Sequence, residues 1–355
     1  MFRKLLFILL ANLSALAYCE VFQSVPDNYK AMLEKEYSVL GIGASCVDFL
    51  IQVDDNFIKA NIFGEKGGST LIDYDSLNRI IELSPTVPKV ATGGSCANVI
   101  KSLAMLGDQC ALLGHHGPDA AGDYFIDYMN KIGVIGFYTK STQPTSRAIC
   151  LTTPDGQRTM RFFPGSSREM DATLLHPDYF KNAKIMHIES YLFRNDNLIE
   201  TAMQHAKEAG ILVSIDLSSF EIVRQYKEQI LKLIAKYVDI VFANEFEAQE
   251  LMGVNPEEAC LKLQEMCPIA VVSLGEHGCV VGSQGRLIKS PAFITTAIDT
   301  TGAGDVFSAG FLHTYLQGKS LEECARFGNR VGSAVVEVIG TELSPERWEA
   351  LRLQD

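Results

Sequence analysis

The chain has 355 residues, of which 47% are hydrophobic and 21% charged, and it contains no tract of low complexity. This composition is typical of a folded protein with a large core, built as one large domain or as a domain with an appendage. The net charge of −12, without a cluster of Lys and Arg, argues against a nucleic-acid partner, because phosphate-backbone recognition needs a basic face. Backbone N–H groups can still bind a small anion locally, so a nucleotide ligand is not excluded.

The first nineteen residues have the pattern of a secretory signal. Arg3 and Lys4 precede an apolar run, and Ala15-Leu16-Ala17 matches an A-x-A cleavage site. The run is too short for a comfortable membrane span, so we expect no stable one. A wrongly chosen start codon, with Met32 as a later candidate, or an amphipathic extension would explain the segment as well. We expect a cytoplasmic protein, with export through residues 1–19 as the alternative.

Apolar strand candidates then alternate with helical stretches along most of the chain. Strands are predicted at 37–43, 111–113, 185–188, 212–216, 240–243 and 269–274. Helices are predicted at 95–106, 122–132, 197–209, 225–237, 245–252, 256–266 and 304–317. Such alternation implies an α/β fold with a mostly parallel sheet covered on both faces.

Two segments do not follow this alternation. Residues 48–92 contain only short strand candidates, at 49–53 and 69–73, and a helical stretch at 74–83. Residues 147–152 and 158–163 flank Pro154-Asp155-Gly156, which indicates a hairpin. We interpret the irregular segments as a small β appendage or lid, and place the lid at roughly 49–92 and 135–146.

Several residues that could carry other chemistry are given structural interpretations. The nine Cys have no CxxC or metal-type spacing, so we expect reduced thiols and no zinc site. Cys96, Cys150, Cys279 and Cys324 lie in apolar stretches and are expected in the core. His115-His116 has no partner at metal spacing, and we expect it in a surface loop.

The strongest local signal is the run Asp299-Thr300-Thr301-Gly302-Ala303-Gly304-Asp305. Its small residues precede a predicted helix, whose N-terminus presents unpaired N–H groups and a partial positive charge. Small side chains let this backbone approach a phosphoryl group closely. Asp305 in the first turn is then placed to accept a proton from an attacking hydroxyl. The alternative is an ordinary Gly-rich turn in which Asp305 caps the helix.

This run resembles the C-terminal signature of the ribokinase-like (PfkB) carbohydrate and nucleoside kinases. The N-terminal signature of that family, a diglycine with Asn four residues after the second Gly, is similar to Gly93-Gly94-Ser95-Cys96-Ala97-Asn98. Asp48, in VLGIGASCVD, matches the substrate-hydroxyl aspartate of the family, and Asn244-x-x-Glu247 is similar to its N-x-x-E motif. The motifs cover about 37–342, and we place the kinase domain at 37–345. The resemblance implies a ribokinase-like three-layer α/β/α sandwich with a small β lid.

The resemblance also implies catalytic roles. Asp305 would be the general base, and Gly302, Ala303 and Gly304 would form the anion hole for the phosphoryl group of ATP. Asn244 and Glu247 would organise Mg²⁺ through its waters, since a hard cation prefers oxygen ligands. Without the family, Glu247 is simply an acidic residue in the first turn of a helix.

Further ligand contacts follow from the same resemblance. Asp299 and Thr301 match positions beside a monovalent cation such as K⁺. The nucleotide side would include Ser273, Gly275 and Gly278 in the loop after a strand, with Asn329 at the adenine pocket. The acceptor would be held by Asp48, Gly94, Ser95, Asn98 and Glu189, whose carboxylate and amide groups suit vicinal hydroxyls.

The acceptor is less narrowly defined than the reaction. Ribokinases tend to carry Lys where this chain has Ser95, whereas 54–92 and 154–160 look more like the adenosine-kinase-like branch. Glu189 resembles an acidic pocket position of sugar kinases. We therefore expect ATP-dependent phosphorylation of a nucleoside or sugar hydroxyl, adenosine first (adenosine + ATP to AMP + ADP), with a ribokinase- or fructokinase-type sugar kinase as the alternative. An exported, non-catalytic binding protein on the same fold is the alternative from another class. Exposed lid strands leave a monomer or a homodimer open.

Overall fold

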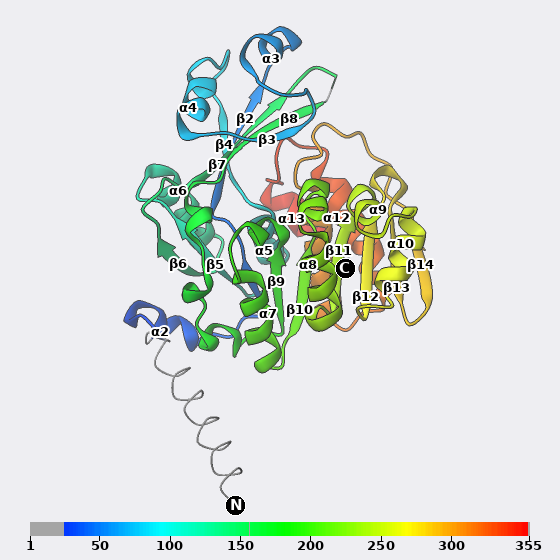
Figure 1. Cartoon of the computed structure of the whole chain (residues 1–355). Helices are drawn as coiled ribbons and strands as arrows, with labels where there is room; N and C mark the ends of the chain where they lie inside the picture. The colour runs from blue at the N-terminus through cyan, green and yellow to red at the C-terminus, as the bar shows by residue number, and fades with distance from the viewer. Residues whose placement is uncertain (1–24, 156, 354–355) are drawn as a thin grey trace, which may run out of the picture.

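The computed structural model describes residues 25–353 except residue 156 (Figure 1). The signal-like segment 1–19 lies outside the described residues. Within residues 25–353, apart from 156, no helix has the length and apolarity needed to cross a membrane.

The core is a nine-stranded sheet with the strand order β14-β13-β12-β11-β10-β9-β1-β5-β6. From β12 to β6 all neighbours pair in parallel, and β13 and β14 add an antiparallel edge. Its strands are β1 (Val39–Ile42), β5 (Cys110–His116), β6 (Ile135–Lys140), β9 (Ile185–Glu189), β10 (Leu212–Asp216), β11 (Ile240–Asn244), β12 (Ile269–Ser273), β13 (Cys279–Ser283) and β14 (Arg286–Ser290).

Helices cover both faces of this central sheet. Because successive strand residues point to opposite faces, Val39 packs in one helical layer and Leu40 in the other. One layer contains α7 (Leu198–Glu208), α8 (Phe220–Tyr237), α9 (Glu245–Met252) and α10 (Pro256–Leu263). The other contains α5 (Ser95–Leu106), α6 (Ala120–Lys131), α11 (Ala303–Leu316) and α12 (Leu321–Val335). The expected three-layer sandwich is confirmed.

A second, five-stranded sheet stands at one end of the central sheet (Figure 1). This small sheet has the order β3 (Ser69–Leu71), β8 (Arg158–Phe163), β7 (Ser146–Thr152), β2 (Cys46–Gln52) and β4 (Lys89–Gly93). Helices α3 (Asp55–Asn61) and α4 (Tyr74–Glu82) pack on one face through Ile58, Leu77 and Ile80. The opposite face carries a separate apolar cluster that includes Leu50, Ala148 and Cys150.

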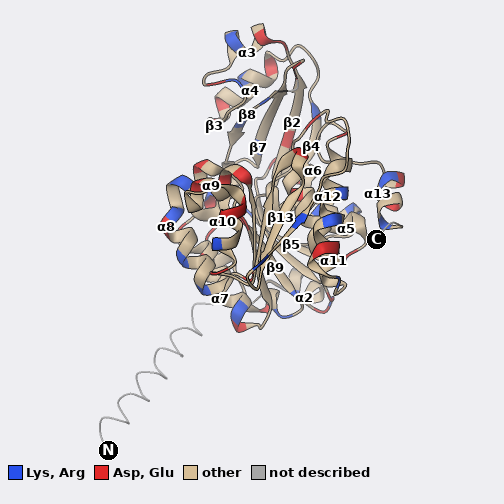
Figure 2. Cartoon of the chain, turned by 90° about the vertical axis from the view of Figure 1, so that its right-hand side faces the viewer, with Lys and Arg blue, Asp and Glu red and all other residues tan. Residues whose placement is uncertain are grey.

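The remaining elements are short or peripheral. They are α2 (Asp27–Leu33), α13 (Pro345–Arg352) and the 3-10 helices η1 (Gly165–Glu169), η2 (Ala172–Leu174), η3 (Pro177–Phe180), η4 (Ser190–Arg194) and η5 (Gly275–His277). Figure 2 shows acidic and basic residues interspersed along the outer helices, for example on α8 and α10.

Three expectations about local structure are corrected. Ile135–Lys140 is not part of a lid, because β6 follows α6 and pairs in parallel with β5 in the central sheet; the hairpin β7–β8 belongs to the small sheet instead. His115 and His116 do not lie in a surface loop: β5 continues through both, and both are buried. Helix α8 begins at Phe220 rather than at 225. Cys96, Cys150, Cys279 and Cys324 are buried free thiols, as expected.

Candidate active site

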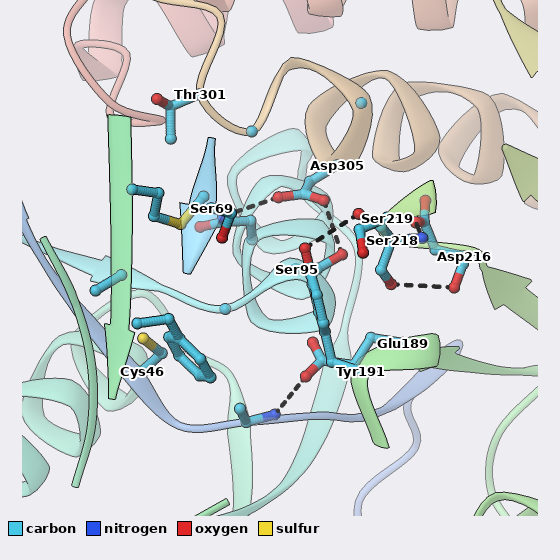
Figure 3. Close-up of a pocket in the computed structure, with 18 of the residues that line it drawn as sticks. Cys46, Ser69, Ser95, Glu189, Tyr191, Asp216, Ser218, Ser219, Thr301 and Asp305 are labelled. Atoms are coloured by element: carbon cyan, nitrogen blue, oxygen red, sulfur yellow. Dashed lines mark hydrogen bonds between the residues drawn. The ribbon is translucent and has the colours of Figure 1, made fainter. Parts of the chain in front are cut away.

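A cavity of about 320 Å³ lies between the carboxyl ends of the central strands and the small sheet. Ligand sites of parallel α/β sheets occur at this edge, and about 300–1,000 Å³ is the usual size for a small-molecule pocket. The wall comes from β2 and β8 of the small sheet, the start of α5, the ends of β9, β10 and β11, and the loop before α11. Figure 3 shows side chains from these distant segments pointing into one space.

The loop before α11 supplies backbone rather than side chains to the cavity. Gly302 is the N-cap of the helix, and its φ of 68° lies in the left-handed region that favours glycine. A Cβ at this position would also overlap Thr341 Cγ2. Ala303 and Gly304 begin the helix and line the cavity, and an added Cβ on Gly304 would meet open space. The structure therefore brings the three predicted anion-hole residues to a helix N-terminus that faces the cavity.

Asp305 lies in the first turn of α11, with its carboxylate directed toward the start of α5 (Figure 3). Ser95 Oγ donates to Oδ1 at 2.8 Å, and Asn98 Nδ2 donates to Oδ2 at 2.9 Å. Burial raises the pKa of Asp305 to about 7, and the nearby Asp216 carboxylate adds to this effect, while Asn98 and Ser95 oppose it. A carboxylate with this pKa is suited to accept a proton near neutral pH.

The predicted acceptor residues line the cavity from two directions. Asp48 projects from β2, and burial raises its pKa to about 6 although the Lys101 ammonium acts in the opposite direction. Gly94 has a φ of 97°, and a Cβ there would overlap the Ala44 carbonyl oxygen. Ser95 and Asn98 follow on α5, so the diglycine turns the chain sharply from the small sheet into the helix that contacts Asp305.

Glu189 ends β9 inside the cavity wall, almost fully buried (Figure 3). Its Oε1 accepts from Ala44 N at 3.1 Å, and its Oε2 accepts from Cys96 N at 2.8 Å. Burial raises its pKa to about 7, whereas these two hydrogen bonds lower it. Through these two hydrogen bonds Glu189 connects the segment just after β1 to the start of α5. It also borders the predicted acceptor space.

Two acidic groups meet on the opposite side of the cavity. Asn244 and Glu247 form a capping box at the start of α9: Asn244 Oδ1 accepts from Glu247 N at 2.9 Å, and Glu247 Oε2 accepts from Asn244 N at 2.8 Å. The buried Glu247 still lines the cavity with Asp216, which ends β10. Burial raises the pKa of both carboxyls. Repulsion from Asp216 adds to the rise for Glu247, and repulsion from Glu189 adds to the rise for Asp216.

This acidic pair fits a hard divalent cation, because carboxylate and amide oxygens are its preferred ligands and a cation would relieve the repulsion. Within the described part of the chain, no three His, Cys, Asp or Glu side chains are grouped closely enough to hold a metal ion directly. Binding through water, as expected for Glu247, is compatible with that arrangement. Asp216 was not predicted, although its position at a strand's carboxyl end was the available signal.

Thr301 and Asp299 are brought together beside the anion hole. Asp299 Oδ1 accepts from Thr301 N at 2.9 Å and from its Oγ1 at 2.6 Å, and Asp299 Oδ2 accepts from Gly340 N at 2.9 Å. Thr301 lines the cavity, whereas Asp299 lies behind it. Arg158, which was not predicted, reaches from β8 and donates from Nη1 to Thr301 Oγ1 at 3.1 Å. The small sheet therefore places a guanidinium beside the helix N-terminus.

The predicted nucleotide-side residues are only partly brought to this cavity. Ser273 lines it, whereas Gly275, Gly278 and Asn329 do not. Gly278 has a φ of 92°, and a Cβ there would overlap the Ser290 carbonyl oxygen. Asn329 Nδ2 donates to Ser290 O at 3.0 Å and to Pro291 O at 3.2 Å, which ties α12 to the end of β14.

Comparisons with known proteins identify the family of the chain. Residues 67–348 match the model of the pfkB family carbohydrate kinases. A crystal structure of adenosine kinase from Sinorhizobium meliloti is 31% identical, with a TM-score of 0.84 over 90% of this chain and 100% of that one. A probable sugar kinase from Rhizobium etli is also 31% identical, with a TM-score of 0.83 over 90% of this chain and 98% of that one. A nucleoside kinase from Methanothermobacter thermautotrophicus is 26% identical over 324 residues, 90% of this chain and 96% of its own.

The chain belongs to the pfkB family of carbohydrate kinases. It has the ribokinase-like fold and adenosine-kinase-like relatives. It is accordingly a phosphotransferase with a hydroxyl acceptor, a carbohydrate or nucleoside kinase that uses ATP.

Proposed function

We propose that the protein transfers the γ-phosphoryl group of ATP to a hydroxyl of a nucleoside, with adenosine as the first candidate. The observation that carries the proposal is the position of Asp305. A partly buried carboxylate with a pKa of about 7 lies in the first turn of a helix whose N-terminal backbone faces the same cavity. A base beside an anion hole is what deprotonation of an acceptor and in-line phosphoryl transfer require.

Each part of the site has a role in this mechanism. Asp305 takes the proton of the acceptor hydroxyl, and Asp48 and Asn98 hold the neighbouring hydroxyls. The N–H groups of Gly302, Ala303 and Gly304 stabilise charge on the transferring group. Arg158 places a further positive charge beside them. Asn244, Glu247 and Asp216 would hold Mg²⁺ through its waters, where it would supply positive charge against the phosphates.

The chemistry of the cavity wall supports a nucleoside over a free sugar. The small sheet contributes an apolar surface to the cavity, formed by Leu71, Ala148, Cys150, Met160 and Phe162. A flat aromatic base buries well against such a surface, whereas a free sugar offers hydroxyls throughout. Ser95, Asn98 and Glu189 supply polar groups near Asp305, where a ribose would lie. Asp48 and Arg158 add polar groups from the small sheet. Closure of the small sheet over the acceptor would exclude water, which otherwise competes as acceptor.

A sugar acceptor is the second candidate. The probable sugar kinase from Rhizobium etli is as similar in identity as the adenosine kinase from Sinorhizobium meliloti. The buried Glu189 at the cavity wall adds a carboxylate that could accept from a sugar hydroxyl.

Three further parts of the proposal concern the setting of the reaction. A monovalent cation such as K⁺ would bind beside Asp299 and Thr301 and stabilise the anion hole. The protein would act where ATP is found, in the cytoplasm. It would be a monomer or a homodimer, in the second case through β3 or β4, which form the edges of the small sheet.

A panel assay tests the proposal. ADP release would be measured with ATP and Mg²⁺ over adenosine, other nucleosides, ribose and hexoses, with and without K⁺. We expect the highest kcat/KM for adenosine among the nucleosides and sugars. A ribose or hexose with higher kcat/KM would contradict the acceptor while leaving the kinase reaction intact.

The matched control is Asp305→Asn, which keeps the size of the side chain and removes the base. We expect kcat to fall by about 10² to 10⁴, and near-normal turnover would contradict the role of Asp305. Acceptor binding without any turnover in the wild-type chain would favour a non-catalytic binding protein. Mass spectrometry of the mature N-terminus would test export, and cleavage after Ala17 would contradict a cytoplasmic location.

A further inference from the structure

A buried lysine behind the site has no part in the mechanism described so far. Lys101 lies in the middle of α5 and is 2% exposed. Its Nζ donates to Thr92 O at 3.1 Å, to Thr92 Oγ1 at 3.1 Å and to Thr341 Oγ1 at 2.8 Å. An ammonium has three donors and no acceptor, so all of its hydrogen-bonding capacity is used by these partners.

The contacts of Lys101 continue toward the catalytic carboxylate. Thr341 Oγ1 donates to Asn98 Oδ1 at 3.2 Å, and Asn98 Nδ2 donates to Asp305 Oδ2 at 2.9 Å. Thr341 and Asn98 are both buried. We call the series Lys101, Thr341, Asn98 and Asp305 the relay. It joins α5, the segment after α12 and the start of α11.

The ammonium fixes the direction of every hydrogen bond in the relay. Because Lys101 can only donate, Thr341 Oγ1 must accept from it and uses its own proton to donate onward. The Asn98 carbonyl oxygen therefore faces Thr341, and the Asn98 amide NH₂ faces Asp305. An NH₂ group needs an acceptor, and Asp305 Oδ2 accepts much more strongly while the carboxylate carries no proton. The second oxygen, Oδ1, accepts from Ser95 Oγ.

We propose that Lys101 is a positioning residue that, through Thr341 and Asn98, orients the Asp305 carboxylate and keeps it in the proton-accepting form. The proposal rests on the proposed function, in which Asp305 is the base. It assigns a function to a lysine that touches neither the acceptor space nor the anion hole, since Lys101 does not line the cavity.

The electrostatic surroundings explain why such a relay is useful. Burial and neighbouring acids favour the protonated form of Asp305, with its pKa near 7. The titratable and charged groups around Asp305 and the anion hole are Asp48, Cys96, Arg158, Glu189, Tyr191, Asp216 and Glu247. Those around Lys101 are Asp48, Lys89, Asp305, Glu342 and the Tyr128 ring. Burial lowers the pKa of Lys101 to about 8, so it remains an ammonium at neutral pH.

The sharpest test is Thr341→Val, which keeps the shape of the side chain and removes the hydroxyl that links Lys101 to Asn98. The Asn98 amide is then free to turn, and its hydrogen bond to the charged Asp305 is lost. Such a bond is worth about a factor of ten. We expect the acidic limb of the kcat/KM profile to move up by about one pH unit, with about a tenfold loss below the limb and recovery toward wild type above roughly pH 8.

Three further variants separate positioning from simple structural support. Lys101→Met should move the acidic limb in the same direction, and Thr341→Ser, which keeps the hydroxyl, should restore the wild-type limb. Ser102→Ala is the matched control, because Ser102 is buried next to Lys101 on α5 and its Oγ has no hydrogen-bond partner among the described residues. It should leave the limb in place.

The outcomes are distinguishable from failure of the proposed function. If Asp305→Asn keeps near-normal turnover, both the base and the relay are contradicted. If Asp305→Asn is inactive while Thr341→Val keeps the wild-type limb, the relay alone is contradicted. An equal loss of activity at every pH in Thr341→Val would also contradict the relay. A relay effect should disappear at high pH, where Asp305 is deprotonated in any case, whereas a structural defect would persist.

Discussion

The substitution Asp305→Asn should stabilise the protein at alkaline pH while it lowers kcat strongly. The pKa of Asp305 rises from 3.8 in the unfolded chain to about 7 in the folded one. The folded state therefore holds a proton that the unfolded state has lost, and this contribution to stability is complete below about pH 4 and is lost as pH rises through 7. Above pH 7 the wild-type protein bears a buried charge that Asn lacks.

The size of the stability change follows from the difference between the folded and unfolded pKa of Asp305. About three pH units at about 1.4 kcal/mol each give roughly 4 kcal/mol, and solvent screening of the half-buried side chain reduces this to about 2 kcal/mol. Asn can retain both contacts, since it can accept from Asn98 and donate to the Ser95 hydroxyl.

Urea unfolding at roughly pH 5 and pH 8.5 measures the difference, provided that the m-values agree. We expect Asp305→Asn to gain about 2 kcal/mol over wild type at the higher pH and much less at the lower one. Equal or lower stability of the variant at pH 8.5 would refute the reasoning from burial.

Other substitutions test the remaining parts of the site. Gly302→Ala should lower the free energy of unfolding by about 2 kcal/mol, because Gly302 has a left-handed φ and a Cβ would overlap Thr341. Gly304→Ala, where a Cβ meets open space, should be neutral or stabilising by up to about 1 kcal/mol. Similar Tm changes for the two variants would contradict this difference. Arg158→Met should lower kcat by about 10² to 10³ with little change in acceptor KM, and unchanged kcat would exclude a role for its charge. Glu247→Gln keeps a capping side chain but should raise the Mg²⁺ concentration for half-maximal activity about tenfold, and an unchanged Mg²⁺ titration would contradict the cation role.

The features that were predicted well from the sequence are those that depend on the residues of one short segment. The buried parallel strands are short, mostly apolar runs, and β10 (Leu212–Asp216) was predicted with its observed bounds. Helix α5 begins directly after the diglycine and was also predicted residue for residue. The residues around Asp305 were found because glycines before an apolar helix indicate an anion hole whatever the rest of the fold.

What the sequence did not reveal depends on contacts between distant segments. Ile135–Lys140 was placed in the lid, and only its pairing with β5 assigns it to the central sheet. Lys101 was not singled out, since a lysine within an apolar helix signals nothing until Thr92 and Thr341 are brought to it. Arg158 was read as part of a hairpin, and its approach to Thr301 is visible only in three dimensions.

The division of the cavity between two sheets has a consequence for how acceptor preference can diverge. The proposed base and anion hole belong to the central body, and the proposed anion hole is made of backbone, so replacing its side chains would alter it little. The apolar acceptor wall belongs to the small sheet, and residues such as Met160 and Phe162 can be exchanged there without disturbing α11. Evolution can thus change the acceptor wall of the small sheet while the start of α11 stays constant. Similar proteins that bear the names adenosine kinase and probable sugar kinase on one architecture are what such modular variation would produce.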